Sequence, residues 1–115
     1  MRVETLDDAR MAVKEAVQAA TEAVEATVGT VSWFPCGFAH VHISDDGRTK
    51  RMQFLRAACA EAGERLQDDW PKGWAFLWGG TWGGQEMLIK EAGCRAAAEV
   101  LKSYGYSAYM TSRMD

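Results

Sequence analysis

Three residues with reactive side chains, Cys36, His40 and His42, fall close together in the run WFPCGFAHVHIS. In an extended strand successive side chains point to opposite faces, so these three share one side while the aliphatic residues among them share the other. A thiolate and two imidazoles would bind Zn²⁺ if a further ligand or a water completed the set. The sequence shows no second pair of ligands, so a metal site is one hypothesis beside an ordinary structural role for both histidines.

The same residues also allow a covalent mechanism. Cys36, at a Pro-Cys-Gly corner, would act as the nucleophile with His40 or His42 as its base if a nearby cation or helix N-terminus activated the thiol. No third orienting residue and no oxyanion loop can be identified in the sequence. Because cysteine is among the residues most often buried, an inert interior thiol is the more ordinary assignment.

A second candidate site lies at the start of the helix expected after this strand, where four basic residues cluster: Arg48, Lys50, Arg51 and Arg56. Cations at a helix N-terminus oppose the macrodipole, but beside free backbone N–H groups they make a site for phosphate. The alternative is a solvated basic face that pairs with Asp45 and Asp46. Two further cations, Lys90 and Arg113, are candidates for binding an anion.

Aromatic residues supply a third candidate feature, since five tryptophans are many for 115 residues. Trp82 stands at the tip of a glycine-flanked loop, 79–84, in which glycine allows close backbone approach. Such residues predict a surface on which a planar ligand stacks. Packing in the core or at a subunit interface is an equal alternative. The aromatic candidates are Trp33, Phe34, Trp74, Trp78, Trp82, Tyr106 and Tyr109.

The spacing of apolar residues predicts helices over 5–28, 50–66 and 85–102, and strands within 31–44, 74–79 and 106–110. Thr5 and Thr49 are predicted helix N-caps, and Gly105 a C-cap. With a short extra strand near 85–88, the order predicts an α+β fold of the ferredoxin-like, split βαβ kind. We expect a single small sheet of three to four strands, two crossover helices on one face, and an additional N-terminal helix.

The predicted sheet has an aliphatic face, which we expect the second and third helices to cover. The opposite face is expected to carry four large aromatic side chains: Phe38, Trp74, Phe76 and Trp78. Because so much apolar surface is rarely left in water, the first helix, a second subunit or a ligand should cover it. The first helix has a narrow apolar stripe, typical of packing at a domain's side or of pairing with a partner chain. We therefore divide the chain into an N-terminal amphipathic helix for packing or oligomerisation, 1–29, and an α/β core domain, 30–115.

Composition indicates one soluble globular domain, with 48% hydrophobic and 25% charged residues in 115. The net charge is −3, and the acidic first helix argues against a nucleic-acid-binding surface. Three cysteines without a CxxC motif fit reduced, intracellular thiols. No signal-like segment and no apolar run of about 18 residues is present, so we expect a cytoplasmic protein without a membrane partner.

Three segments, WFPCGFAHV at 33–41, GGQEMLIKEAGCRAAAEVL at 83–101 and SRMD at 112–115, resemble a family of small bacteriophage and prophage proteins of unknown function. The resemblance covers roughly residues 31–115 and leaves the first helix as a variable appendage. His40 stands where that pattern has an aromatic residue. The resemblance implies no activity, cofactor or catalytic residue. It implies an accessory protein of the host-cell cytoplasm that acts by binding, for example by sequestering a nucleotide signal of host defence or by blocking a defence protein.

These observations favour a non-catalytic, homo-oligomeric phage protein that binds a small anionic, nucleotide-like ligand and counteracts host defence by sequestering it. No cofactor is expected. The alternative is an inhibitor that binds a host protein through its acidic first helix or its aromatic face. A Cys36-based enzyme or metalloprotein is a further alternative. The residues assigned to the ligand are Arg48, Lys50, Arg51, Trp78, Trp82, Lys90 and Arg113.

Overall fold

The computed structural model describes residues 2–27, 37–77 and 87–114, with the side chains of 37, 38, 77, 87, 88, 113 and 114 excepted. Cys36, Trp78 and Trp82 lie outside these ranges, as does the side chain of Arg113. No helix in the described ranges is long and apolar enough to cross a membrane. The elements in chain order are α1 (Leu6–Thr27), β1 (Gly37–Ile43), α2 (Lys50–Ala62), β2 (Arg65–Asp68), β3 (Trp74–Leu77), α3 (Met87–Ser103) and β4 (Ala108–Met114).

The strands form one antiparallel sheet in the order β2-β3-β1-β4, in which β1 pairs with both β3 and β4. Strands β1 and β2 point the same way and are joined through α2, while β3 lies between them. In the same manner β3 and β4 are joined through α3, with β1 between them. Each β-α-β unit is thus split by a strand of the other, which is the ferredoxin-like arrangement. The predicted α+β class, with one small sheet and an N-terminal helix, is confirmed.

Strand β2 begins within the segment 50–66 that the sequence predicts as helix, so the prediction is wrong for residues 65 and 66. The predicted helix over 50–66 ends at Ala62, because Gly63 adopts a φ of 74° and the N–H of Glu64 donates to the carbonyl of Cys59 at 2.9 Å. The chain then turns, and β2 begins at Arg65. The extra strand predicted near 85–88 is wrong for residues 87 and 88, which open α3.

The predicted helix caps are confirmed. The Thr5 hydroxyl accepts a hydrogen bond from the N–H of Asp8, and the Asp8 carboxylate accepts one from the N–H of Thr5, each at 3.1 Å. Thr49 caps α2 by accepting from the N–H of Met52 at 3.4 Å. Gly105 follows α3 with a φ of 97°, a left-handed conformation that suits glycine.

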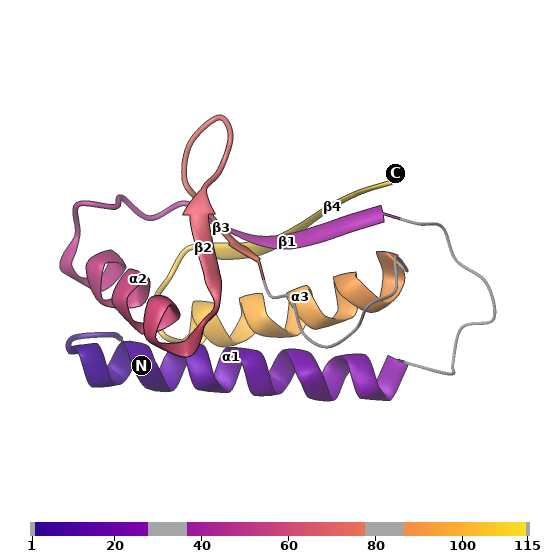
Figure 1. Ribbon diagram of the computed structural model, residues 1–115, viewed down its shortest axis with the longest axis horizontal. Coiled ribbons are helices and arrows are strands. Elements are labelled where there is room, and N and C mark those ends of the chain that lie inside the picture. Colours follow the sequence, from indigo (N-terminus) through magenta and orange to yellow (C-terminus); the bar gives the residue numbers. More distant parts are fainter. Residues whose placement is uncertain (1, 28–36, 78–86, 115) are drawn as a thin grey trace.

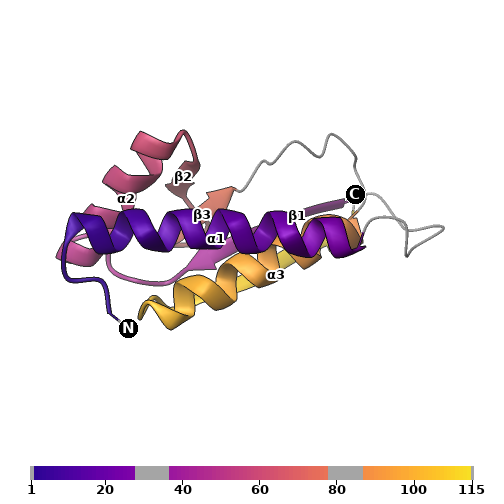
Figure 2. The same ribbon diagram turned by 90° about the horizontal axis from the view of Figure 1, so that it is seen from below.

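Three layers are visible in Figure 1: the sheet, then α2 and α3, then α1 on their far side. Figure 2 shows α1 in front, flanked by α2 and α3. In the described part of the chain α1 contacts both helices and no strand. Small side chains let α1 lie close to them, so a helix with a narrow apolar stripe still joins the main hydrophobic cluster. Its buried residues are Ala9, Ala12, Val13, Ala16, Ala20 and Val24.

The register of the sheet decides which side chains share a face, because directly paired residues of antiparallel strands point the same way. Val41 pairs with Phe76 and Ile43 pairs with Trp74. Both aromatic residues therefore lie on the helix-covered face, where Phe76 is fully buried. The prediction that Trp74 and Phe76 share the uncovered face with the histidines is wrong, since alternation within one strand does not fix its register against the next.

The uncovered face is mixed in character. It carries His40 and His42 from β1, with Ala75 of β3 and Tyr109 and Thr111 of β4 paired beside them. Helix α1 lies beyond the other face, so it does not cover this one. The loop that joins β2 to β3 projects from the sheet on the side away from the helices (Figure 1). Its first residue, Asp69, lies within hydrogen-bond distance of His40 and His42 on this face.

Candidate metal centre

Strand β1 supplies two of the three side chains at the candidate site. His40 and His42 are two residues apart and therefore share a face, as predicted. Tyr109 on β4 is the direct partner of His42, and the two ring centroids lie 5.0 Å apart with the ring planes tilted by 39°. The phenol ring thus restricts the orientation of the His42 imidazole.

The β2–β3 loop supplies the third side chain. The N–H of Asp69, the first residue of the loop, donates to the carbonyl of Gly73 at 2.9 Å and closes the turn. Gly73 has a φ of 98°, which glycine adopts readily and other residues rarely do. A Cβ at Gly73 would lie 2.8 Å from the His42 ring, so the loop packs directly on β1. This packing carries the Asp69 carboxylate to the histidines.

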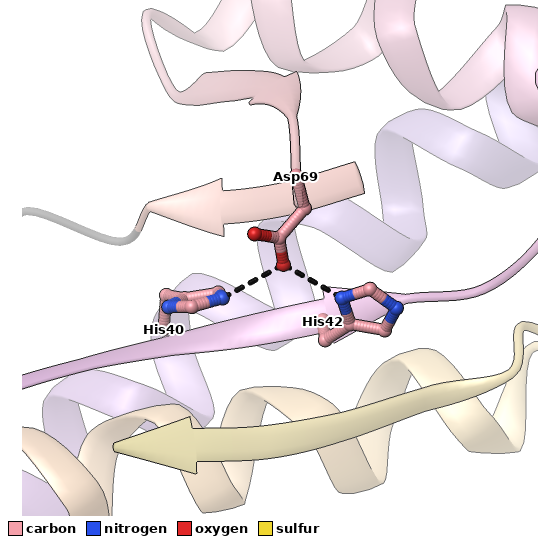
Figure 3. Close-up of side chains that lie close together, drawn as sticks. All are labelled: His40, His42 and Asp69. Carbon is pink, nitrogen blue, oxygen red and sulfur yellow. Dashed lines mark hydrogen bonds and ion pairs between the residues drawn. The ribbon is translucent and has the colours of Figure 1, made fainter. Parts of the chain in front are cut away.

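One oxygen of Asp69 bridges the two imidazoles (Figure 3). Its Oδ2 lies 2.9 Å from His40 Nε2 and 2.6 Å from His42 Nδ1. The other oxygen, Oδ1, accepts a hydrogen bond from the N–H of Trp70 at 2.8 Å. Because an ionised carboxylate only accepts, each of the two imidazole nitrogens carries the hydrogen and donates it. We refer to His40, His42 and Asp69 as the His-Asp cluster.

The cluster is partly shielded from water. The exposed fractions of the side chains are 25% for His40, 18% for Asp69 and 12% for His42. Burial by itself raises the pKa of Asp69, but the hydrogen bonds from His42, His40 and the Trp70 N–H outweigh it, so the pKa is lowered. Asp69 therefore presents a negative charge to the histidines at neutral pH.

An open cleft of about 370 Å³ lies over the cluster. Its floor is the sheet, and one wall is the β2–β3 loop. The imidazole and carboxylate groups of the cluster thus face a space that solvent and small molecules can enter. Besides the cluster, the cleft is lined by Ser44, Trp70, Pro71, Lys72, Tyr109 and Thr111.

The donor set matches a metal site. Among the described residues, His40, His42 and Asp69 form a group whose ligand atoms all lie within 4.8 Å of one another. Two neutral imidazoles and one carboxylate are the protein ligands of many zinc sites that keep a position open for water or substrate. The same set holds iron in mononuclear oxygenases. His40 Nε2, His42 Nδ1 and the Asp69 carboxylate would hold such an ion, and each imidazole, still neutral, would then carry its hydrogen on its other ring nitrogen.

The basic residues predicted to hold an anion have acidic partners. Arg48 pairs with Asp46 at 2.8 Å, and its side chain is 91% exposed. Arg51 pairs with Asp45, also at 2.8 Å. Lys50 is exposed in the first turn of α2. This arrangement is the paired basic face that the sequence offered as the alternative.

Lys90 lies elsewhere in the fold. It belongs to the first turn of α3, which begins at the opposite end of the molecule from the start of α2 (Figure 1). The described geometry therefore does not bring Lys90 together with Arg48, Lys50 and Arg51. The predicted metal ligand Cys36, one residue before β1, lies outside the described residues.

Six residues that line the cleft were not singled out as functional from the sequence: Ser44, Asp69, Trp70, Pro71, Lys72 and Thr111. The run DDWPKG has the composition of a turn, which is a usable signal for a loop. It does not show that the loop folds back over β1, because β2 itself was not predicted. Tyr109, in contrast, was among the aromatic candidates.

The chain is therefore a ferredoxin-like α+β protein with a His-Asp cluster on its uncovered sheet face. Comparison of the sequence with protein-family models and with curated proteins, and of the fold with solved structures, gives no match.

Proposed function

We propose that this protein binds a divalent transition-metal ion, with Zn²⁺ the best fit to the donor set, through the His-Asp cluster. The single observation that carries the proposal is that His40 Nε2, His42 Nδ1 and Asp69 Oδ2 converge at the floor of an open cleft. Of the functions weighed from the sequence, the geometry favours the metalloprotein.

The surroundings of the cluster support this assignment. Metal sites hold their ligands in place through a second set of contacts. Here the Trp70 N–H fixes one oxygen of Asp69, and the Tyr109 ring lies against His42. The ligands also come from a paired strand and from a loop closed by its own hydrogen bond, so little ordering is needed when the ion binds.

The test is metal binding by the full chain without an affinity tag, after treatment with a chelator. Isothermal titration with ZnCl₂ should give one ion per chain. Co²⁺ bound in place of Zn²⁺ should give visible absorption bands. The sequence holds two histidines, His40 and His42, so no other histidine can replace a lost ligand and the ligand variants should lose these bands. His42→Ala and Asp69→Asn should each weaken binding by more than the roughly 10- to 100-fold that loss of an outer contact costs.

Two matched variants sharpen the test. Asp46→Asn removes a neighbouring exposed carboxylate and should leave the affinity for Zn²⁺ unchanged. Cys36→Ser tests whether the Cys36 thiolate is a fourth ligand of the ion. A thiolate ligand adds a sulfur-to-cobalt charge-transfer band to the Co²⁺ spectrum, and this variant would lose that band. If no ion binds stoichiometrically, or if His42→Ala and Asp69→Asn bind as the wild type does, the proposal is wrong and the cluster is a structural hydrogen-bond network.

A further inference from the structure

Exposed aromatic side chains gather at the cleft. Among the described residues, the large hydrophobic side chains that remain exposed are Met11, Trp70 and Tyr109, at 52%, 87% and 54%. Two of the three line the cleft above the His-Asp cluster, and they come from different elements, the β2–β3 loop and β4. An indole left almost fully in water beside polar donors is an unusual use of surface, and it suits stacking on a planar ring.

With a divalent ion bound, the His-Asp cluster would have a net positive charge, which favours an anionic ligand. A divalent ion bound by two neutral imidazoles and one carboxylate leaves a net charge of about +1 and at least one open coordination position. Lys72, on the same loop, also lines the cleft, and none of the salt bridges within the described part of the chain includes it. A phosphate oxygen bound to the ion and facing Lys72 would neutralise both charges.

The space limits the size of the ligand. The cleft of about 370 Å³ lies at the small end of ligand pockets, which range from roughly 300 to 1,000 Å³. One nucleotide unit fits that volume, whereas a longer strand would extend past the rim. A second cleft adjoins the first and shares Ser44, Asp69, Pro71 and Lys72 with it. It is also lined by Asp45, Asp46 and Asp68, which disfavours an anion there.

We propose that the cleft binds a mononucleotide, with its base stacked on Trp70 or Tyr109 and its phosphate bound by the metal ion and Lys72. This inference rests on the proposed metal function, because the ion supplies much of the positive charge. It keeps the ligand class expected from the sequence, a small nucleotide-like anion, but moves the site from the start of α2 to the uncovered face of the sheet.

Adenosine 5′-monophosphate, titrated into the Zn²⁺-loaded chain, tests the inference. It should bind more tightly than adenosine, which lacks the phosphate, and more tightly than ribose 5-phosphate, which lacks the base. Trp70→Ala should weaken binding of the nucleotide about tenfold, within the range that loss of one stacking contact produces. Lys72→Ala should weaken it as well. Neither variant should change the affinity for Zn²⁺ alone.

Matched controls use residues away from the cleft. Met11→Ala removes an exposed hydrophobic side chain from α1, and Lys50→Ala removes a lysine from the start of α2. Both should bind the nucleotide as the wild type does. If Lys50→Ala or Arg48→Ala abolishes binding while Lys72→Ala does not, the ligand site lies at α2 and the inference is overturned.

The two proposals fail in different ways. If the chain binds Zn²⁺ stoichiometrically but binds adenosine monophosphate no better than adenosine or ribose 5-phosphate, only the nucleotide inference is lost. If no metal binds, the metal function fails, and the inference that depends on it falls too. Equal nucleotide affinity with and without Zn²⁺ would also overturn the inference, because the ion would then not hold the phosphate.

Discussion

Gly73 lies against the imidazole of His42 with no room for a side chain between them. A Cβ at Gly73 would stand 2.8 Å from His42 Nε2 and 2.8 Å from the carbonyl oxygen of Ile43, and the φ of Gly73 is 98°. The β2–β3 loop can therefore pack on β1 and place Asp69 only if residue 73 is glycine. Loop geometry and cluster geometry depend on the same residue.

Gly73→Ala should destabilise the fold by about 2–4 kcal/mol, because it combines a strained backbone with a collision against main-chain and ring atoms. Gly63→Ala is the matched control, since Gly63 also has a positive φ, 74°, but has no atom near its would-be Cβ. That control should lose only about 1–2 kcal/mol, the cost of the left-handed backbone. Urea denaturation measures both. If both variants lost the same free energy of unfolding, the contact between residue 73 and His42 would not be tight.

Asp45→Ala should be among the more damaging single changes outside the apolar core. The Asp45 side chain is 3% exposed, and it accepts hydrogen bonds from Arg51 Nη2 at 2.8 Å and from the N–H of Ser107 at 2.7 Å. Its removal leaves these donors without their acceptor, at a cost of about 2–4 kcal/mol. Asp46→Ala, next in sequence but on an exposed ion pair with Arg48, should have a much smaller effect in the same denaturation experiment.

The pair Tyr104–Glu15 predicts a loss of stability at alkaline pH. The Tyr104 hydroxyl donates to Glu15 Oε2 at 2.5 Å, and this bond, with burial, raises the pKa of Tyr104 from 10.0 to about 12. The folded state therefore holds the phenol proton more tightly than the unfolded state does. The contribution to stability is complete below pH 10 and is lost as the pH rises toward 12.

Tyr104→Phe should flatten that decline, because phenylalanine has no proton to lose. Urea denaturation at pH 8, 10 and 11 gives the free energy of unfolding for both proteins. The difference between wild type and variant should narrow as the pH rises. Curves that stay parallel over this range would contradict the assignment of the decline to Tyr104.

Cys59 and Cys94 should resist alkylation while the protein is folded. Burial raises the pKa of the Cys59 thiol to about 12 and that of Cys94 to about 11, and the thiolate is the reactive form. Iodoacetamide at pH 8 should leave both thiols unmodified in the native chain and modify both in 8 M urea. Peptide mapping by mass spectrometry follows each thiol separately, so reaction at Cys36 does not interfere. If Cys59 and Cys94 reacted as fast in the native chain as in 8 M urea, the helices that bury them would open readily.

Much of the fold could be predicted from local sequence. Thr5, Thr49 and Gly105 mark helix ends through hydrogen bonds and backbone angles that a few neighbouring residues determine, and all three predictions are confirmed. Strand β2 was missed because its four residues, RLQD, have exposed side chains with one exception and so show no clear alternation. The faces of Trp74 and Phe76 were predicted wrongly because they depend on pairing with β1, which lies more than 30 residues away.

Two of the three residues of the His-Asp cluster could likewise be predicted from local sequence. His40 and His42 share a face because of strand geometry alone, so their proximity could be inferred from spacing. Their partner Asp69 could not be, because it approaches through a turn that depends on Gly73 and on the register of β3. The acidic partners of Arg48 and Arg51 are close in sequence, and for that reason the paired basic face could be anticipated.

The separation between the cluster's ligands has a consequence for how the chain folds. Asp69 follows His42 by 27 residues, a stretch that includes all of α2 and β2. The ligands therefore meet only after this stretch has folded and the hairpin has docked on β1. An ion held by all three residues would act as a reversible cross-link that closes the chain between His42 and Asp69. Because this cross-link forms late, it would slow the unfolding of the β2–β3 hairpin far more than it would speed the early steps of folding.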